Sequence, residues 1–202
     1  MDSIKVKRHP ERGKYDLDTI YGILDQGMVC HVAFAQDGVQ FNIPMLYVRI
    51  GNELFLHGSM KSRIYSTLVS GADTCISVTI LDGVVVAKSA YNCSMNYRSA
   101  SIYGKISPVQ DQEEKIDVMK KLVEKMIPGR WDDCRKPNMN EVDVTGIMKI
   151  SIDKFSSKVR EGEPIDNEAD LGLPHWTGVI PLSITSGNPI TSGADNCRLN
   201  NP

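Results

Sequence analysis

Short apolar segments separated by tight-turn sequences make up most of this chain of 202 residues. Apolar and polar positions alternate in several segments, which is typical of strands with one buried face. An Asp-Gly pair between two such segments predicts a hairpin, and the chain has two, Asp37-Gly38 and Asp82-Gly83. We therefore expect strands on both sides of each pair, including residues 39–50, 74–81 and 84–90, and further strands at 53–57, 93–109 (bent at Gly104) and 147–152.

Helical periodicity is confined to a few places. Asp16 to Gln26 has apolar residues on one face and is followed by Gly27, a typical helix stop. Asp111 and Glu114 resemble a capping box, and the apolar pattern after them ends at Pro128-Gly129. Many short strands with few helices favour a closed antiparallel barrel over a parallel α/β sheet. The expected fold class is therefore mainly β with flanking helices.

The segment from Leu54 to Arg63 is the most informative for function. An apolar strand runs into a turn of small residues, and a helix is expected to begin there with Ser59 as its cap and Lys61, Ser62 and Arg63 in its first turn. Unpaired N–H groups, a hydroxyl and two cations favour a phosphate group. The alternative is a helix start with two solvated cations.

The preceding strand contains a proline in its middle, at Pro44. Proline cannot donate to a ladder, so we expect strand pairing to be interrupted there. The backbone groups of Asn42, Ile43 and Met45 could then bind the edge of a flat heterocycle, because unpaired buried backbone groups are costly. The alternative is a simple edge strand.

The order of these features resembles the flavin-binding split barrels of the pyridoxamine 5′-phosphate oxidase-like superfamily, especially its flavin-nucleotide-binding branch. Ser62 and Arg63 match the pair that holds the flavin phosphate there, and Arg98 and Ser99 match a second flavin contact on the strand ending at Gly104. The resemblance covers roughly residues 14–182 and includes the stretches Leu81-Asp82-Gly83, Ser94-Met95-Asn96-Tyr97-Arg98, Pro128-Gly129-Arg130-Trp131 and Trp176-Thr177-Gly178-Val179.

The resemblance implies a split β-barrel of the FMN-binding type and a homodimer with FMN at the subunit interface. An ordinary structural or surface role is an equal or stronger alternative for six of the candidates: His57, Lys61, Thr79, Arg98, Ser99 and Trp176. The candidate cofactor-binding residues are Asn42, Ile43, Pro44, Met45, His57, Gly58, Lys61, Ser62, Arg63, Thr79, Arg98, Ser99 and Trp176.

Composition excludes several other classes. The net charge of −2, without a basic stripe, argues against nucleic acid as a partner. The five cysteines form no CxxC pair, and the neighbours Cys30 and His31 point to opposite faces of a strand, so no metal site is expected. No apolar segment resembles a signal peptide or a membrane span, which favours a cytoplasmic location. We expect an N-terminal arm at residues 1–13, one domain at 14–182 and a disordered tail at 183–202.

The leading functional hypothesis is an FMN-dependent oxidoreductase acting on an unidentified small molecule or electron donor, with no catalytic side chain assigned. Residues 180–185 lack the arginine and histidine with which vitamin B6 oxidases bind their substrate phosphate, which argues against pyridoxamine 5′-phosphate oxidation itself. The alternatives are a flavin-binding protein without turnover, or a relative that has lost its flavin or binds haem through a histidine such as His57.

Overall fold

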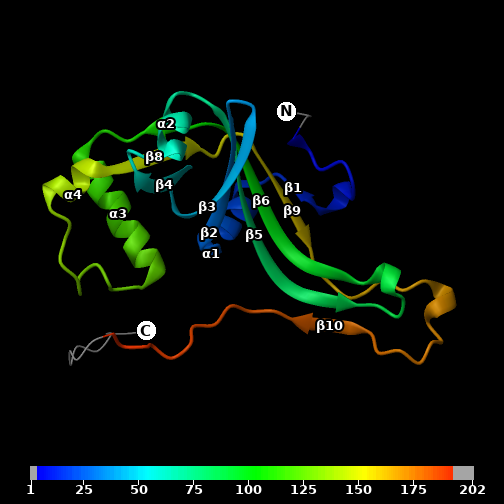
Figure 1. Cartoon of the computed structure of the whole chain (residues 1–202). Coiled ribbons are helices and arrows are strands. Elements are labelled where there is room, and N and C mark those ends of the chain that lie inside the picture. Colours follow the sequence, from blue (N-terminus) through cyan, green and yellow to red (C-terminus); the bar gives the residue numbers. More distant parts are fainter. Residues whose placement is uncertain (1–3, 193–202) are drawn as a thin grey trace. The chain divides into compact units, whose positions relative to one another are not determined.

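The computed structural model of the chain describes residues 4–192 (Figure 1). Contacts between residues divide the chain into two compact units that are interleaved in the sequence. The first unit contains residues 1–27, 77–101 and 155–184, and the second contains residues 28–76, 102–154 and 185–202. The expectation of one domain at 14–182 stays a prediction.

The second unit is an antiparallel sheet, in the order β5-β2-β3-β4-β8-β7. The hairpin expected at Asp37-Gly38 is confirmed: both residues have positive φ, 51° and 77°, as a type I′ turn requires. The start of β5 is tied to β2 by the Thr74 hydroxyl, which donates to the Ala33 carbonyl at 2.8 Å. The strands are β2 (Val29–Gln36), β3 (Val39–Ile50), β4 (Glu53–Ser59), β5 (Asp73–Val86), β7 (Ser107–Pro108) and β8 (Thr145–Ser151).

The described part of this unit contains three helices, α2 (Arg63–Val69), α3 (Gln112–Met126) and α4 (Met139–Val144). The start expected for α3 is confirmed, because the Asp111 carboxylate accepts the Glu114 N–H at 2.8 Å. The apolar face of α3 covers one face of the sheet, and the resulting core contains Val48, Phe55, Val109, Val118, Leu122 and Ile147.

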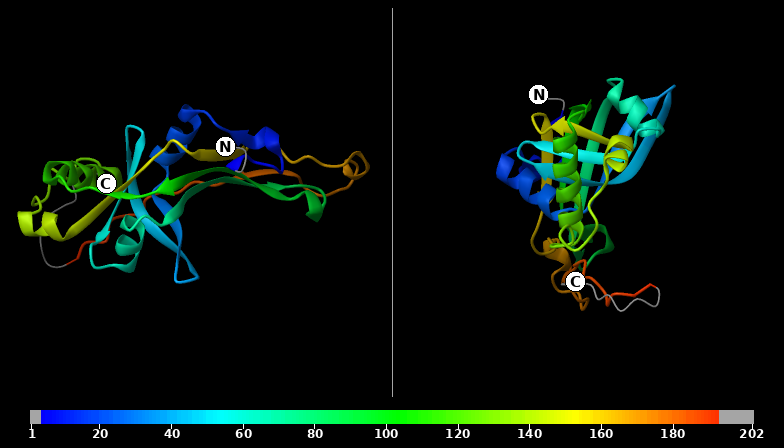
Figure 2. Two further views of the ribbon diagram at one scale, coloured as in Figure 1. Left: turned by 90° about the horizontal axis from the view of Figure 1, so that it is seen from above. Right: turned by 90° about the vertical axis from the view of Figure 1, so that its left-hand side faces the viewer.

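The first unit pairs β1, β9, β6 and β5 in that order, with β10 against β5. The long strands β5 and β6 lie side by side in every view (Figures 1 and 2). The expected first helix is confirmed as α1 (Leu17–Gln26), with Asp16 accepting the Thr19 N–H and Gly27 following. The remaining elements are β1 (Gly13–Lys14), β6 (Ser94–Lys105), β9 (Phe155–Arg160), β10 (Gly178–Pro181) and the 3₁₀ turns η2 (Pro10–Arg12), η3 (Ala90–Asn92) and η4 (Glu168–Asp170).

The hairpin expected at Asp82-Gly83 is wrong, because β5 runs straight through this pair. The Asp82 carboxylate accepts two hydrogen bonds from the Arg98 guanidinium, at 2.6 and 2.9 Å. Gly83 pairs with Pro181 of β10, and a Cβ at Gly83 would lie 2.9 Å from Cγ1 of Val179. The glycine therefore admits the close approach of β10 instead of forming a turn.

The two ends of the described chain differ in their contacts with the rest of the protein. The N-terminal arm is held by a hydrogen bond from the Val6 N–H to the Tyr15 hydroxyl at 2.8 Å, and its last residue belongs to β1. Residues 183–192 are exposed and contain neither helix nor strand, and the rest of the expected tail lies outside the described residues. Within residues 4–192, no helix combines the length and the apolar character needed to cross a membrane.

Candidate flavin site at the opening between β3 and β4

An opening forms where β3 and β4 stop pairing with each other. They pair from Ile50 and Glu53 to Tyr47 and Leu56, and both strands then continue separately. Beyond that point β3 pairs only with β2, and β4 pairs only with β8, as far as Ser59. The edge of β3 that faces away from β2 therefore has no partner strand along residues 39–46 of the described sheet.

The expected interruption of pairing at Pro44 is wrong, because β2 and β3 stay in register through it. In a two-residue type I′ hairpin the residues that flank the turn form a hydrogen-bonded pair, here Gln36 and Val39. Hydrogen-bonded pairs then alternate along the ladder, so the odd-numbered residues of β3 direct their backbone groups toward β2. Pro44 is even-numbered, and its missing N–H falls on the open edge.

This register also corrects which backbone groups are available to a ligand. Ile43 and Met45 pair with β2, so their backbone groups do not face the opening. Asn42 and Leu46 do face it. The structure therefore leaves one edge of β3 open near Pro44, and the residues that face it differ in part from those expected; their contact with a ligand stays a prediction.

The helix after β4 begins later than expected. Ser62, not Ser59, is the cap of α2: its Oγ accepts the Tyr65 N–H at 3.3 Å. The Ser62 hydroxyl also donates to the Ser59 carbonyl at 2.6 Å, so it must release this bond before it can donate to a phosphate. Because α2 has only seven residues, we assign the attraction for an anion to side-chain charge and not to the helix dipole.

Two cationic side chains, Lys61 and Arg63, lie beside the opening. The Arg63 guanidinium lies 4.8 Å from the centre of the Phe41 ring on β3, and Phe41 stacks on Phe34 at 5.3 Å. Arg63 and Lys61 are both exposed, and within the described part of the chain no ion pair engages either of them. Their charges are available to an anionic ligand.

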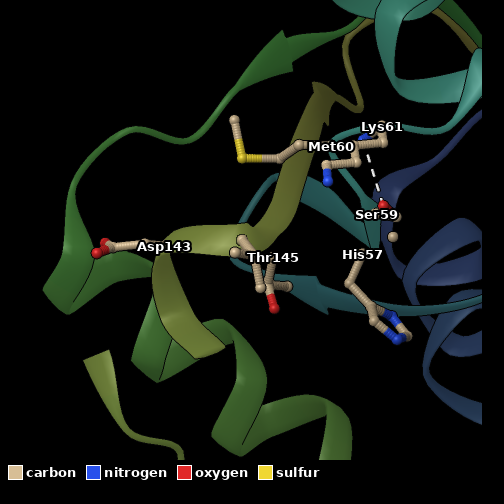
Figure 3. Close-up of a pocket in the computed structure, with 8 residues that line it drawn as sticks. His57, Ser59, Met60, Lys61, Asp143 and Thr145 are labelled. Carbon is tan, nitrogen blue, oxygen red and sulfur yellow. Dashed lines mark hydrogen bonds between the residues drawn. The ribbon is translucent and has the colours of Figure 1, made fainter. Parts of the chain in front are cut away.

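A pocket of about 800 Å³ adjoins this end of β4 (Figure 3). In Figure 3 the side chains of His57 and Thr145 lie on the same side of neighbouring strands, whereas Asp143 extends away. Desolvation by its surroundings lowers the pKa of His57, which favours the neutral form of its imidazole. The lining residues are His57, Gly58, Ser59, Met60, Lys61, Asp143, Val144 and Thr145.

Glycine is required on β8 where α2 packs against it. Gly146 pairs with Gly58, and a Cβ at Gly146 would lie 2.6 Å from the Tyr65 ring of α2. This close packing holds the start of α2, and with it the two cations, beside the end of β4.

Part of the pocket was missed by sequence reasoning, namely the wall formed by residues 143–145. The available signal was the capping box at Asn138 and Glu141, in which each side chain accepts the other residue's backbone N–H. It predicts a short helix directly before the strand at 147–152, but not the proximity of that helix to the turn after β4.

The other candidate residues, Thr79, Arg98, Ser99 and Trp176, belong to the first unit. Arg98 binds Asp82, which raises the pKa of Arg98, and donates to the Gln26 side chain at 2.6 Å. Ser99 Oγ donates to the Lys158 carbonyl at 3.4 Å, and Thr79 is exposed. Trp176 is 62% exposed, with its ring edge against Gly178. Arg98 thus has a structural role, and contacts of these four residues with a flavin stay predictions.

Comparison with known proteins agrees with this architecture. Residues 16–159 match the sequence model of the pyridoxamine 5′-phosphate oxidase family. The flavocytochrome Anf3 from Azotobacter vinelandii is 34% identical, with a TM-score of 0.92 over 100% of this chain and 94% of that one. An FAD and haem binding protein from Mycobacterium smegmatis is 33% identical, with a TM-score of 0.85 over 91% and 90%. A search of curated proteins found no significant match.

A putative 5-nitroimidazole antibiotic resistance protein from Bacteroides thetaiotaomicron shares the fold at 22% identity, with a TM-score of 0.62 over 73% of this chain and 86% of that one. The mostly antiparallel sheet with its helices is thus the split barrel of flavin-binding proteins, and the expected fold class is confirmed. The chain belongs to the pyridoxamine 5′-phosphate oxidase family.

Proposed function

We propose that this protein binds a flavin nucleotide, in the FMN form expected from the sequence, and is a flavin-dependent oxidoreductase acting on a small molecule. The observation that carries the proposal is the opening between β3 and β4, where, among residues 4–192, a strand edge without a partner strand lies beside two cations that form no ion pair. A flat ring with donors and acceptors on its edge and an anionic tail has the complementary chemistry.

Each part of the opening has a definite role in this proposal. The backbone groups of Asn42 and Leu46 would hold the edge of the ring, and Arg63 and Lys61 would hold the phosphate. Phe41 keeps the Arg63 guanidinium beside β3. The bound flavin would supply hydride or electron transfer, while the protein positions the ring and limits access of water.

The relatives support a flavin. One is described as an FAD and haem binding protein, which differs from the FMN expected from the sequence, and another as a flavocytochrome, a name that specifies no particular flavin. FMN and FAD share the ring and the first phosphate, which are the groups that this opening suits. We further propose a homodimer with the flavin at the subunit interface and a cytoplasmic location; both rest on the family resemblance and on the composition of the chain.

Haem binding through His57 is the second candidate function. Two relatives are named for haem or cytochrome character, and His57, whose lowered pKa favours the neutral imidazole, lines a pocket of about 800 Å³. A neutral imidazole nitrogen is the form that binds iron. In this candidate the protein carries electrons between a flavin and a haem.

Absorption spectra of the purified protein, recorded before and after addition of NADPH or dithionite, test both candidates. Flavin bands support the first candidate, and chromatography of the released cofactor identifies it as FMN or FAD. A Soret band that His57→Ala removes, but the matched exposed control His175→Ala keeps, supports the second. A colourless protein that binds neither FMN nor FAD in a titration contradicts the flavin proposal. If NADPH bleaches the flavin bands but every small-molecule acceptor tested reoxidises the reduced flavin only slowly, the protein is a flavin carrier and not an enzyme.

A further inference from the structure

A second pocket, of about 650 Å³, lies within the first unit and concentrates positive charge. Its walls come from the N-terminal segment, the turn η3 with the start of β6, and the end of β9 with the loop after it. Among residues 4–192, no aspartate or glutamate lines this pocket, although the chain as a whole has a net charge of −2. Four cationic side chains line it: Arg8, Arg12, Lys158 and Arg160.

Arg160 is the most unusual of the four, because only 8% of it is exposed. Its guanidinium donates to the Asn96 side-chain oxygen, and the Asn96 amide donates to the Gly162 carbonyl at 3.0 Å. Within the described part of the chain, no carboxylate forms an ion pair with Arg160. Burial and the nearby charge of Arg12 lower the pKa of Arg160. A buried guanidinium beside a second one is unfavourable unless an anion joins them.

Local structure fixes the position of Arg12. It precedes Gly13, which pairs with Lys158 in the β1–β9 ladder, so Arg12 lies next to the end of β9. In the described part of the chain, the one carboxylate that forms an ion pair with Arg12 is that of Glu11, at 3.6 Å, and the same carboxylate contacts His9 at 3.1 Å. The Glu11 side chain is 63% exposed and does not line the pocket, so it offsets little of the charge inside.

The uncharged side-chain amide of Asn92 also favours an anionic ligand in this pocket. Asn92 lines the pocket, and its side-chain nitrogen is buried with no hydrogen-bond partner among the residues that the structure describes. Buried donors that have no acceptor cost free energy, and in a pocket of this size a bound ligand can provide the acceptor. The pocket therefore combines guanidinium, ammonium and amide donors, which together suit an oxyanion that carries more than one negative charge.

We infer that this pocket binds the diphosphate group of a small ligand. The Arg12 and Arg160 guanidinium groups and the Lys158 ammonium would neutralise its charge, and the Asn92 amide would donate to one of its oxygens. Tyr97 also lines the pocket and offers an aromatic ring for a nucleoside attached to the diphosphate. The site uses residues of the first unit alone and shares none with the opening between β3 and β4.

Isothermal titration of the full chain with inorganic pyrophosphate and with adenosine diphosphate tests this inference. Replacement of the buried Arg160 can disturb folding, so the informative variants are the half-buried Arg12→Gln and Lys158→Gln. The control is Lys154→Gln, which makes the same charge change at an exposed lysine outside the pocket. Each of the two variants should weaken pyrophosphate binding roughly tenfold or more, whereas the control should bind like the unmodified protein.

The two probes identify the source of the diphosphate. Tighter binding of adenosine diphosphate than of pyrophosphate assigns the site to nucleotides, and equal binding assigns it to the free anion. Absence of pyrophosphate binding at low ionic strength overturns the inference, and so does binding that Arg12→Gln and Lys158→Gln leave intact. Displacement of pyrophosphate by FMN would show that the site is not separate. Because flavin titrations of the same variants report on the opening beside β3, the two proposals can fail independently.

Discussion

Replacement of Arg63 by alanine is the sharpest test of the phosphate site beside β3. Arg63 is exposed, is the first residue of α2 and lies 4.8 Å from the Phe41 ring. An exposed cation–π contact contributes about 0.5–1 kcal/mol. Because this is the one stabilising contact assigned to the exposed side chain within residues 4–192, Arg63→Ala should lower the free energy of unfolding by about 1 kcal/mol or less.

The effect on ligand binding should be much larger than the effect on folding. A hydrogen bond between a guanidinium and a phosphate contributes roughly 1.5–3 kcal/mol, which corresponds to an affinity about 10- to 100-fold weaker in the variant. Because part of this attraction is screened by salt, the difference should shrink as ionic strength rises. Arg63→Lys keeps the charge but loses the planar fork, and we expect an intermediate affinity.

The assay is a titration of cofactor-free protein with FMN, followed by flavin fluorescence at low and at high salt, together with thermal unfolding of each variant. Lys154→Ala, which removes an exposed cation outside the lining of the pocket, is the control. Unchanged FMN affinity in a folded Arg63→Ala variant would refute the phosphate site. A weaker affinity accompanied by a large fall in melting temperature would refute the reasoning that separates binding from folding.

Three further predictions concern stability and reactivity. Gly146→Ala should lower the free energy of unfolding, measured by denaturant titration, by about 1–3 kcal/mol, because the added Cβ would lie 2.6 Å from the Tyr65 ring of α2. In the same assay Gly22→Ala in α1 should raise the free energy of unfolding by roughly 0.5–1 kcal/mol, because a Cβ at Gly22 has no atom of the described residues within 4 Å. Burial raises the pKa of the Cys30 thiol to about 12. Iodoacetamide at pH 8 should therefore leave Cys30 of the native protein unmodified while the exposed Cys93 reacts, and mass spectrometry of the products would show this. Rapid modification of Cys30 would contradict its burial. Hydrogen bonds from the Arg135 side chain and the Asn138 N–H lower the pKa of Glu141 to about 2 from 4.5. The carboxylate therefore contributes fully to stability above pH 4.5, and this contribution is lost as the pH falls toward 2. In urea unfolding, the free energy of Glu141→Gln should depend less on pH in this window than that of the unmodified protein, and an equal pH dependence would contradict the pairing.

The sequence by itself determined the elements whose signals are local. α1 and α3 begin at the aspartates and follow the apolar periodicity from which they were predicted, because a cap and an amphipathic face act within a few residues of the chain. The type I′ turn at Asp37-Gly38 was predictable for the same reason. The position of Lys61 and Arg63 after an apolar strand was also visible in the sequence, together with the chemistry that these cations favour.

Tertiary structure decided what the same local signals mean in different places. Asp-Gly forms a turn at 37–38 but lies inside a strand at 82–83, where Arg98 binds the carboxylate and β10 pairs with the glycine. Pro44 leaves the β2–β3 ladder intact because the register turns its missing N–H toward the open edge. The opening itself exists because β3 and β4 part after four residue pairs, and the basic pocket exists because β1 places Arg12 beside β9. Strand partners are chosen by contacts between residues far apart in the sequence, so no local pattern could specify either site.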